Sequence, residues 1–198
     1  MDATNPASVE ELVKRIHREL GTIDVLCHAT GGAKTAAFLK TDDALWHEMV
    51  SVNLTAAFLV ARAVLPDMIA KKKGRLVFIG STASRSGFRY CSAYAASKHG
   101  LLGMVRSLAL ELGEADVTAN VIGPGFLDVD ATHKAAAEVA SRTGRSVDEV
   151  LTNYRSFSPQ KRLLRPDEVS TTALFLASDA ARGINGQCLV LDGGAIVS

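Results

Sequence analysis

Apolar residues recur with helical spacing along several stretches of the chain, and short runs that are apolar throughout lie between them. Spacings of three and four residues bring side chains to one helix face, whereas continuous apolar runs are typical of strands buried on both sides. We therefore predict helices at residues 8–20, 42–70, 92–112 and 166–178, and strands at residues 23–29, 75–80, 117–122 and 187–191. Residues 127–159 are polar, rich in alanine and helical in pattern, with no counterpart strand.

Local signals refine the boundaries of the first elements. Ser8 with Glu11 forms a capping-box pattern, and Gly21 supplies a stop for the first helix. We expect Pro66 to divide or kink the second helix, because proline has no backbone donor. Cys27 lies in an apolar strand run and is expected to be a buried thiol.

Apolar strands that alternate with helices indicate an α/β fold with a parallel sheet covered on both faces. The 198 residues suffice for one hydrophobic core, which we interpret as a single domain. Ligands of such sheets bind beyond the carboxyl ends of the strands. The site is therefore expected at the loops that follow the four strands: residues 30–32, Ser81, residues 123–125 and residues 192–194.

Composition narrows the function classes. The formal net charge of +1 supplies no basic field for nucleic acid. The first residues contain no apolar signal segment, and the apolar stretches are broken by charges and too short to span a bilayer. The three cysteines lack the spacing of a disulfide framework or a metal site. We expect a cytoplasmic protein that binds neither nucleic acid, membrane nor metal.

Four side chains could carry chemistry. Tyr94 and Lys98 stand four residues apart on a predicted helix, so they share a face. A neighbouring ammonium group lowers the pKa of a phenol and lets the pair move a proton to or from an alcohol oxygen. The alternative is a partly exposed helix surface. Ser81 could bond a substrate carbonyl or serve as a turn serine, and Asn53 could serve the site or bond a loop.

Taken together, these four residues resemble the Asn-Ser-Tyr-Lys tetrad of the classical short-chain dehydrogenase/reductase family. Asn53 stands in a Val-Asn-Leu context one helix upstream, and Ser81, Tyr94 and Lys98 follow in the family's order. The resemblance runs over nearly the whole chain. It includes the family-like segments 23–26, 94–98, 120–125, 165–169, 175–178 and 192–194.

This resemblance implies an oxidoreductase that interconverts a secondary alcohol and a ketone with NAD or NADP. Tyr94 would exchange the proton, Lys98 would lower the pKa of Tyr94 and hold the nicotinamide ribose, and Ser81 would orient the carbonyl. Asn53 would position a water in a proton relay behind Lys98. Further cofactor contacts implied by the family pattern are Asp2 at the adenine, Ala29 and Gly31 after the first strand, and Pro124, Gly125, Phe126 and Leu127 along the nicotinamide.

The chain departs from the family at its front. We expect a Rossmann-like, doubly wound parallel sheet that lacks its first three strands and the glycine-rich turn, a unit of roughly sixty residues. The residues that choose between NAD and NADP are then absent, and strand 23–29 borders an open edge. His28 replaces an asparagine of the family pattern, and we interpret it as a structural histidine with paired nitrogens rather than a titrating group.

Two functional hypotheses follow. In the first, the chain is an enzyme, residues 127–160 are its substrate lid, and the pattern around Ser141–Gly144 and Ser158 is most similar to members that handle 3-oxoacyl or 3-hydroxyacyl substrates. In the second, the chain is a non-catalytic homologue, an interaction subunit or a mis-started fragment. The helices at 42–70 and 92–112 resemble the pair through which the family forms homodimers and homotetramers, so either hypothesis permits association.

Overall fold

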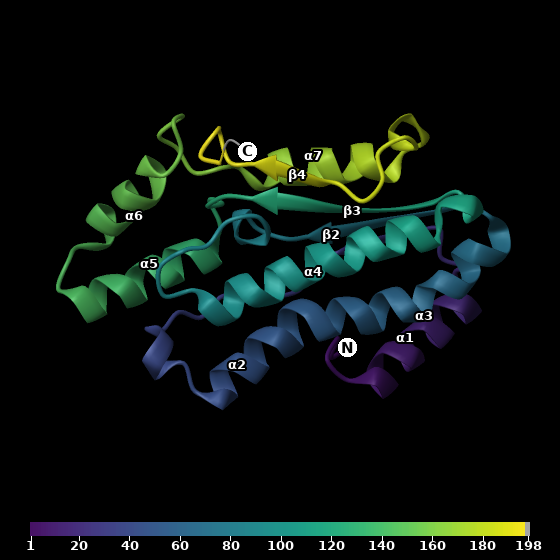
Figure 1. Ribbon diagram of the computed structural model, residues 1–198, viewed down its shortest axis with the longest axis horizontal. Coiled ribbons are helices and arrows are strands. Elements are labelled where there is room, and N and C mark those ends of the chain that lie inside the picture. The colour runs from purple at the N-terminus through teal and green to yellow at the C-terminus, as the bar shows by residue number, and fades with distance from the viewer. Residues whose placement is uncertain (197–198) are drawn as a thin grey trace.

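In the computed structural model, which describes residues 1–196, the chain forms a four-stranded parallel sheet with helices on both faces (Figure 1). The α/β fold predicted from the apolar runs is confirmed. The strands, in spatial order, are β1 (Val25–His28), β2 (Gly74–Ile79), β3 (Val117–Pro124) and β4 (Cys188–Leu191). The helices are α1 (Pro6–Glu19), α2 (Asp43–Val50), α3 (Ala56–Lys71), α4 (Ser92–Glu111), α5 (Asp130–Thr143), α6 (Val147–Ser156) and α7 (Pro166–Ala177).

Alternate residues of the central strands supply two separate cores. Leu76 and Phe78 of β2 pack with α3 and α4 on one face of the sheet, and Val77 packs with α7 on the other. Figure 1 shows this layering, with α3 and α4 below the sheet, α7 above it and α1 outside α3. The central strands β2 and β3 are therefore buried on both sides, as their continuous apolar runs predict.

Strand β1 lies at the edge of the sheet. Among residues 1–196 it pairs only with β2, where Val25 lies opposite Arg75 and His28 opposite Phe78. Helix α7 covers β2 and β3, so the side chains of Val25 and Cys27, on the α7 side of β1, are exposed. The expectation that Cys27 is a buried thiol is therefore wrong, whereas an open edge at this strand was predicted.

Helix α1 begins earlier than the capping-box pattern predicted. Its N-cap is Asn5, whose side-chain oxygen accepts hydrogen bonds from Ala7 N at 3.0 Å and Ser8 N at 3.3 Å. Pro6 occupies the first helical position, where its missing N–H costs nothing. Ser8 lies inside the first turn and accepts a bond from Asp2 N instead. The prediction that Ser8 caps this helix with Glu11 is wrong, because an asparagine followed by proline starts it three residues sooner.

The second predicted helix is interrupted at a different point from the one expected. Pro66 remains inside α3, and the break is a π-helical turn at Ser51–Thr55, between α2 and α3. The whole segment Asp43–Lys71 is long and apolar enough, by length and composition, to cross a membrane, which contradicts the expectation that each apolar stretch is too short. Its buried residues, among them Ala57, Val64 and Met68, form the core beneath the sheet.

Residues between β3 and α7 form a helical hairpin with a core of its own. Helices α5 and α6 pack mainly against each other through Ala136, Ala140, Val150 and Leu151, with Leu163 behind them. Its two ends meet where Asp128 N donates to Leu164 O at 2.7 Å and Leu164 N donates to Phe126 O at 2.9 Å. The segment predicted as a lid thus consists of two helices held together at one base.

Replacing Asn5 by alanine tests the observed start of α1. We expect Asn5→Ala to lower the free energy of unfolding by about 1 kcal/mol, because two backbone N–H groups lose their acceptor. Ser8→Ala is the matched control and should change stability by much less. Urea unfolding monitored by circular dichroism measures both variants. A larger loss in Ser8→Ala would instead favour the capping box.

Candidate active site

Asn53 is fixed at the centre of the π-turn. Its side chain is 1% exposed, and its Nδ2 donates to Gly32 O at 2.9 Å and Met49 O at 3.0 Å, while its Oδ1 accepts from Gly32 N at 3.2 Å. The π-turn widens the helix there, a distortion that often marks functional positions. Asn53 therefore bonds a loop, as one of its two sequence interpretations proposed, and that loop is the turn after β1.

Lys98 lies behind this turn on α4. The side chain is 4% exposed, and its Nζ donates to the carbonyl of Ile79 at 3.0 Å, at the end of β2. Burial lowers the pKa of Lys98 to about 8, because the charged form loses its hydration. A lysine with this pKa remains mostly protonated at neutral pH and holds a positive charge at the carboxyl edge of the sheet.

Tyr94 shares the inner face of α4 with Lys98, whose Nζ lies 5.8 Å from the centre of the phenol ring. Burial raises the pKa of Tyr94, while a hydrogen bond with the Ser81 side chain lowers it by a smaller amount. This direction is opposite to the lowering expected from Lys98. The ammonium of Lys98 is directed to the Ile79 carbonyl, so desolvation of the phenol dominates in this arrangement.

Ser81 stands where β2 gives way to a 3₁₀ turn at Thr82–Ser84. Its hydroxyl caps that turn by accepting from Ala83 N at 3.1 Å, and Ser84 Oγ accepts from Ser81 N at 3.3 Å. The turn role is thus confirmed, and the same hydroxyl lies near enough to the Tyr94 phenol to lower its pKa. The capped turn holds Ser81 in one position beside the phenol.

Gly31 leaves room for the cluster formed by Asn53 and Lys98. It has φ of +151°, and a Cβ added there would lie 2.6 Å from Asn53 Oδ1 and 3.6 Å from Lys98 Nζ. A side chain at this position would displace one of the two groups. Ala29 and Gly31 are exposed after the end of β1, so the backbone beside Lys98 is open to a ligand. These features fit the ribose end of a nicotinamide cofactor.

The segment after β3 reaches the same edge of the sheet. Pro124 is buried, Gly125 and Leu127 are partly buried, and Phe126 is 38% exposed. A Cβ on Gly125 would lie 3.2 Å from that of Asp192, so the glycine lets this segment pass close to the loop after β4. The Phe126 ring stacks on Tyr154 of α6.

The structure does not connect Asp2 to this cluster by any hydrogen bond in residues 1–196. Its carboxylate accepts from Thr4 N at 2.8 Å and Thr4 Oγ1 at 2.7 Å, and these bonds lower the pKa of Asp2. Asp2 lies just before α1 and is exposed. Its proposed contact with adenine remains a prediction from the family pattern.

His28 is the structural histidine expected from the sequence. It is 4% exposed, its Nε2 bonds Thr30 Oγ1 at 2.9 Å, and burial together with the nearby charge of Lys98 lowers its pKa to about 4. It is therefore neutral at physiological pH. Thr30 was not among the residues predicted for the site, because the Thr-Gly-Gly order gives no signal that its hydroxyl pairs with His28.

Two residues near Tyr94 were missed from the sequence. Cys91 precedes α4, and its thiol lies close enough to both phenols to contribute to the raised pKa values of Tyr94 and Tyr154. Tyr154 belongs to α6, far along the chain, so only tertiary packing brings it to this place. A single tyrosine in a polar helix carries no signal of such a contact.

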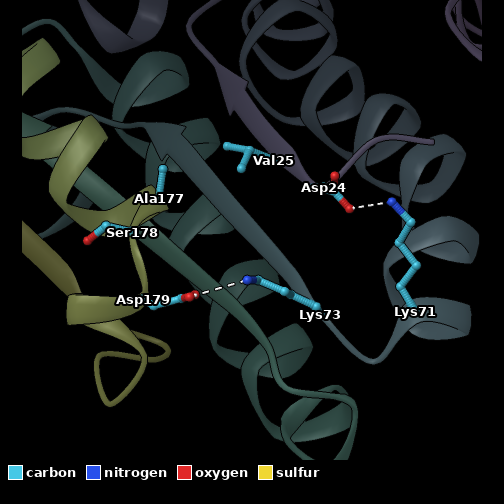
Figure 2. Close-up of a pocket in the computed structure, with 7 residues that line it drawn as sticks. All are labelled: Asp24, Val25, Lys71, Lys73, Ala177, Ser178 and Asp179. Carbon is cyan, nitrogen blue, oxygen red and sulfur yellow. Dashed lines mark hydrogen bonds and ion pairs between the residues drawn. The ribbon is translucent and has the colours of Figure 1, made fainter. Parts of the chain in front are cut away.

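A separate hollow lies elsewhere. It has a volume of about 610 Å³ and lies at the opposite end of the sheet, where Asp24 precedes β1 and Lys73 precedes β2 (Figure 2). Its charged groups neutralise one another, since Lys71 Nζ bonds Asp24 at 2.7 Å and Lys73 Nζ bonds Asp179 at 3.2 Å. Parallel sheets bind ligands at their carboxyl ends, so this hollow is not the candidate active site.

The tetrad geometry agrees with the comparisons with known proteins. A family model described as enoyl-(acyl carrier protein) reductase matches residues 1–195. The 3-oxoacyl-[acyl-carrier-protein] reductase FabG of Escherichia coli is 31% identical over 98% of this chain and 75% of its own length. The chain belongs to the short-chain dehydrogenase/reductase family. The reductase MabA of Mycobacterium bovis is 35% identical over 98% of this chain and 74% of its own length.

Solved structures of the short-chain dehydrogenase/reductase family superpose closely. Sorbitol-6-phosphate 2-dehydrogenase SrlD from Erwinia amylovora gives a TM-score of 0.95 at 31% identity, covering 100% of this chain and 78% of its own. A variant of actinorhodin polyketide ketoreductase crystallised with NADPH gives a TM-score of 0.94 at 29% identity. The match covers 98% of this chain and 75% of the ketoreductase chain. The chain is an NAD(P)-dependent oxidoreductase that interconverts alcohols and ketones.

Burial of Lys98 predicts a pH-dependent stability difference. The folded pKa of about 8 lies below the ordinary value of 10.5, so the unfolded chain binds more protons between these values and stability rises with pH there. We expect Lys98→Met to have its largest stability advantage over the parent below pH 8. That advantage should shrink as pH approaches 10.5. Loss of the hydrogen bond to Ile79 O changes the size of the difference in stability, but not the direction in which it changes with pH.

Denaturant unfolding at a series of pH values measures this difference. Lys14→Met is the matched control, since Lys14 is exposed on α1 and the substitution makes the same change of side chain. A pH-independent difference for Lys98→Met would show that Lys98 titrates as an ordinary exposed lysine.

Proposed function

We propose that this short-chain dehydrogenase/reductase reduces the ketone of a 3-oxoacyl compound, or oxidises the matching 3-hydroxyacyl compound, with Tyr94 as the proton-exchanging group. One observation carries the proposal: side chains from the π-turn, the end of β2 and helix α4 converge at the carboxyl edge of the sheet. The 3-oxoacyl class is taken from the names of the bacterial relatives.

In the proposed reduction, the Ser81 hydroxyl and the Tyr94 phenol both bond the substrate carbonyl oxygen. A nicotinamide cofactor, when bound, supplies the hydride to the carbonyl carbon. Tyr94 gives its proton to the oxygen as negative charge develops there, and the positive charge of Lys98 stabilises the phenolate left behind. The raised pKa of Tyr94 keeps the phenol protonated at neutral pH, ready to donate.

The residues around Gly31 fit the cofactor. Gly31 and Ala29 present exposed backbone beside Lys98, whose ammonium would bond the ribose hydroxyls. Pro124, Gly125, Phe126 and Leu127 would form the wall beside the nicotinamide ring. Asn53 keeps the glycine turn in place and, in the proposed relay, would position a water behind Lys98. The cofactor is NAD or NADP. The similar ketoreductase was crystallised with NADPH, so NADPH is tested beside NADH.

Residues 127–160 are proposed as the lid over the substrate, and a homodimer or homotetramer is proposed as the assembly. The support for association is that α3 and α4 each present a large apolar side chain to solvent. Phe58 on α3 is 43% exposed, and Leu110 on α4 is 88% exposed. Such side chains on neighbouring helices favour contact with a second subunit.

The first test is a titration of the purified chain with NADH and with NADPH, followed by nicotinamide fluorescence. The proposal expects saturable binding of at least one of them, and reduction of an acetoacetyl ester when that cofactor is present. A folded chain that binds neither would contradict it.

Removal of the Tyr94 hydroxyl tests the proton transfer. We expect Tyr94→Phe to lower kcat by about 100-fold or more, because general acid catalysis is lost, while cofactor affinity changes little. The matched control is Tyr90→Phe, at an exposed tyrosine in the loop before α4, which should keep the parent rate. Near-normal turnover by Tyr94→Phe would remove Tyr94 from its proposed role.

A further inference from the structure

One aromatic contact joins the proposed lid, residues 127–160, to Phe126 in the segment proposed to lie beside the nicotinamide. The rings of Phe126 and Tyr154 lie 4.3 Å apart, centre to centre, with their planes only 6° from parallel. Phe157, at the end of α6, leans against Phe126 at 5.7 Å and 44°. Three rings from two distant segments therefore meet at one place, and aromatic pairs at these separations attract each other.

A further attachment of the lid is at its base. Backbone bonds join Asp128 to Leu164 and Leu164 to Phe126, while α5 and α6 pack mainly on each other. Tyr154 packs against this small hairpin core on one side and on Phe126 on the other. The hairpin is thus held against the sheet by its base, by the stack on Phe126 and by the bond that Ser158 Oγ donates to Gly193 O at 3.5 Å.

Beneath the stack lies a cavity of about 80 Å³ at the carboxyl ends of β2, β3 and β4. Four aromatic residues line it, Phe88, Phe126, Tyr154 and Phe157, and the charged residues Arg162 and Asp192 line it as well. Thr82, which directly follows Ser81 in the chain, lines it too, so the cavity lies at the same edge of the sheet as the proposed catalytic residues.

The size of this cavity limits what can enter it. An apolar cavity of about 150 Å³ holds one benzene molecule. The present cavity has about half that volume, so it admits a substituent of only a few carbon atoms while the rings stay stacked. A longer chain must separate Tyr154 from Phe126 before it can fit.

We propose that Tyr154 is a specificity-determining residue: its stack on Phe126 restricts the substrate to carbonyl compounds with a short apolar side chain. The inference rests on the proposed function, because the carbonyl held by Ser81 and Tyr94 is what directs one substituent into the cavity. With this size limit, the chain would differ in substrate length from an enzyme that accepts long acyl chains.

The experiment compares two 3-oxo esters that differ only in chain length, ethyl acetoacetate and ethyl 3-oxooctanoate, with NADH and NADPH. We expect the parent to favour the shorter ester in kcat/KM by about tenfold or more, as pockets that exclude extra methylene groups do. Tyr154→Ala should remove most of that preference by raising kcat/KM for the longer ester. Tyr154→Phe, which keeps the ring, and Thr152→Ala, at an exposed position on α6, should retain it.

Two measurements are independent of turnover. Ligand-observed NMR of the same esters without cofactor should detect binding of the shorter one to the parent and of both to Tyr154→Ala. Hydrogen exchange of residues 147–156 should be faster in Tyr154→Ala than in the parent, and unchanged in Tyr154→Phe, because only the first loses the stack.

The outcomes separate this inference from the proposed function. Turnover with the same chain-length profile in the parent and Tyr154→Ala overturns the size limit and leaves the function standing. No turnover by any variant, combined with length-selective binding that Tyr154→Ala abolishes, overturns the function and supports the size limit. Equal binding of both esters to the parent overturns the size limit whatever the turnover.

Discussion

The buried ammonium of Lys98 is the group on which the carboxyl edge of the sheet depends. Its hydrogen bond to the Ile79 carbonyl joins α4 to the end of β2. The turn after β1 lies beside this ammonium, and it requires a glycine because a Cβ at Gly31 would lie 2.6 Å from Asn53 Oδ1. That turn is held by Asn53 and lies beside the His28–Thr30 pair. A charge placed in low dielectric thus determines the arrangement of several loops at once.

Strands and helix faces, which follow from patterns that repeat along the chain, were predictable from the sequence. The positions of a single helix cap and a single helix break were less predictable. The continuous apolar runs of β2 and β3 predicted strands buried on both sides, and the spacing of Tyr94 and Lys98 predicted a shared helix face. The cap of α1 was misplaced, because both Asn5 and Ser8 suit an N-cap and the capping-box pattern of Ser8 was followed instead of the proline after Asn5. The break before α3 was assigned to Pro66, since no residue type identifies a π-turn in advance.

The candidate site likewise has features that the sequence predicted and features that it did not. The family pattern named residues whose places follow from strand ends and helix faces, and Asn53, Ser81, Tyr94 and Lys98 lie at the carboxyl edge of the sheet, whereas the proposed role of Asp2 stays a prediction. It could not anticipate the direction of the Tyr94 pKa, which depends on how far the phenol is buried and where the Lys98 ammonium is directed. It also missed Tyr154, because a contact between α6 and the segment after β3 depends on how a self-contained hairpin folds back over the sheet. Long-range packing of this kind leaves no periodic signal.

The π-turn at Ser51–Thr55 has a consequence for how the site tolerates changes in chain length. A π-turn holds one residue more than the α-helical turn it replaces. Losing that residue would restore a regular helix and close the widened turn, which changes the directions in which the side chains of residues 51–55 point. Asn53 would then no longer face Gly32, although every tetrad residue type would still be present. At this point the number of residues matters as much as their identity, so a single-residue deletion here would be more damaging than many substitutions.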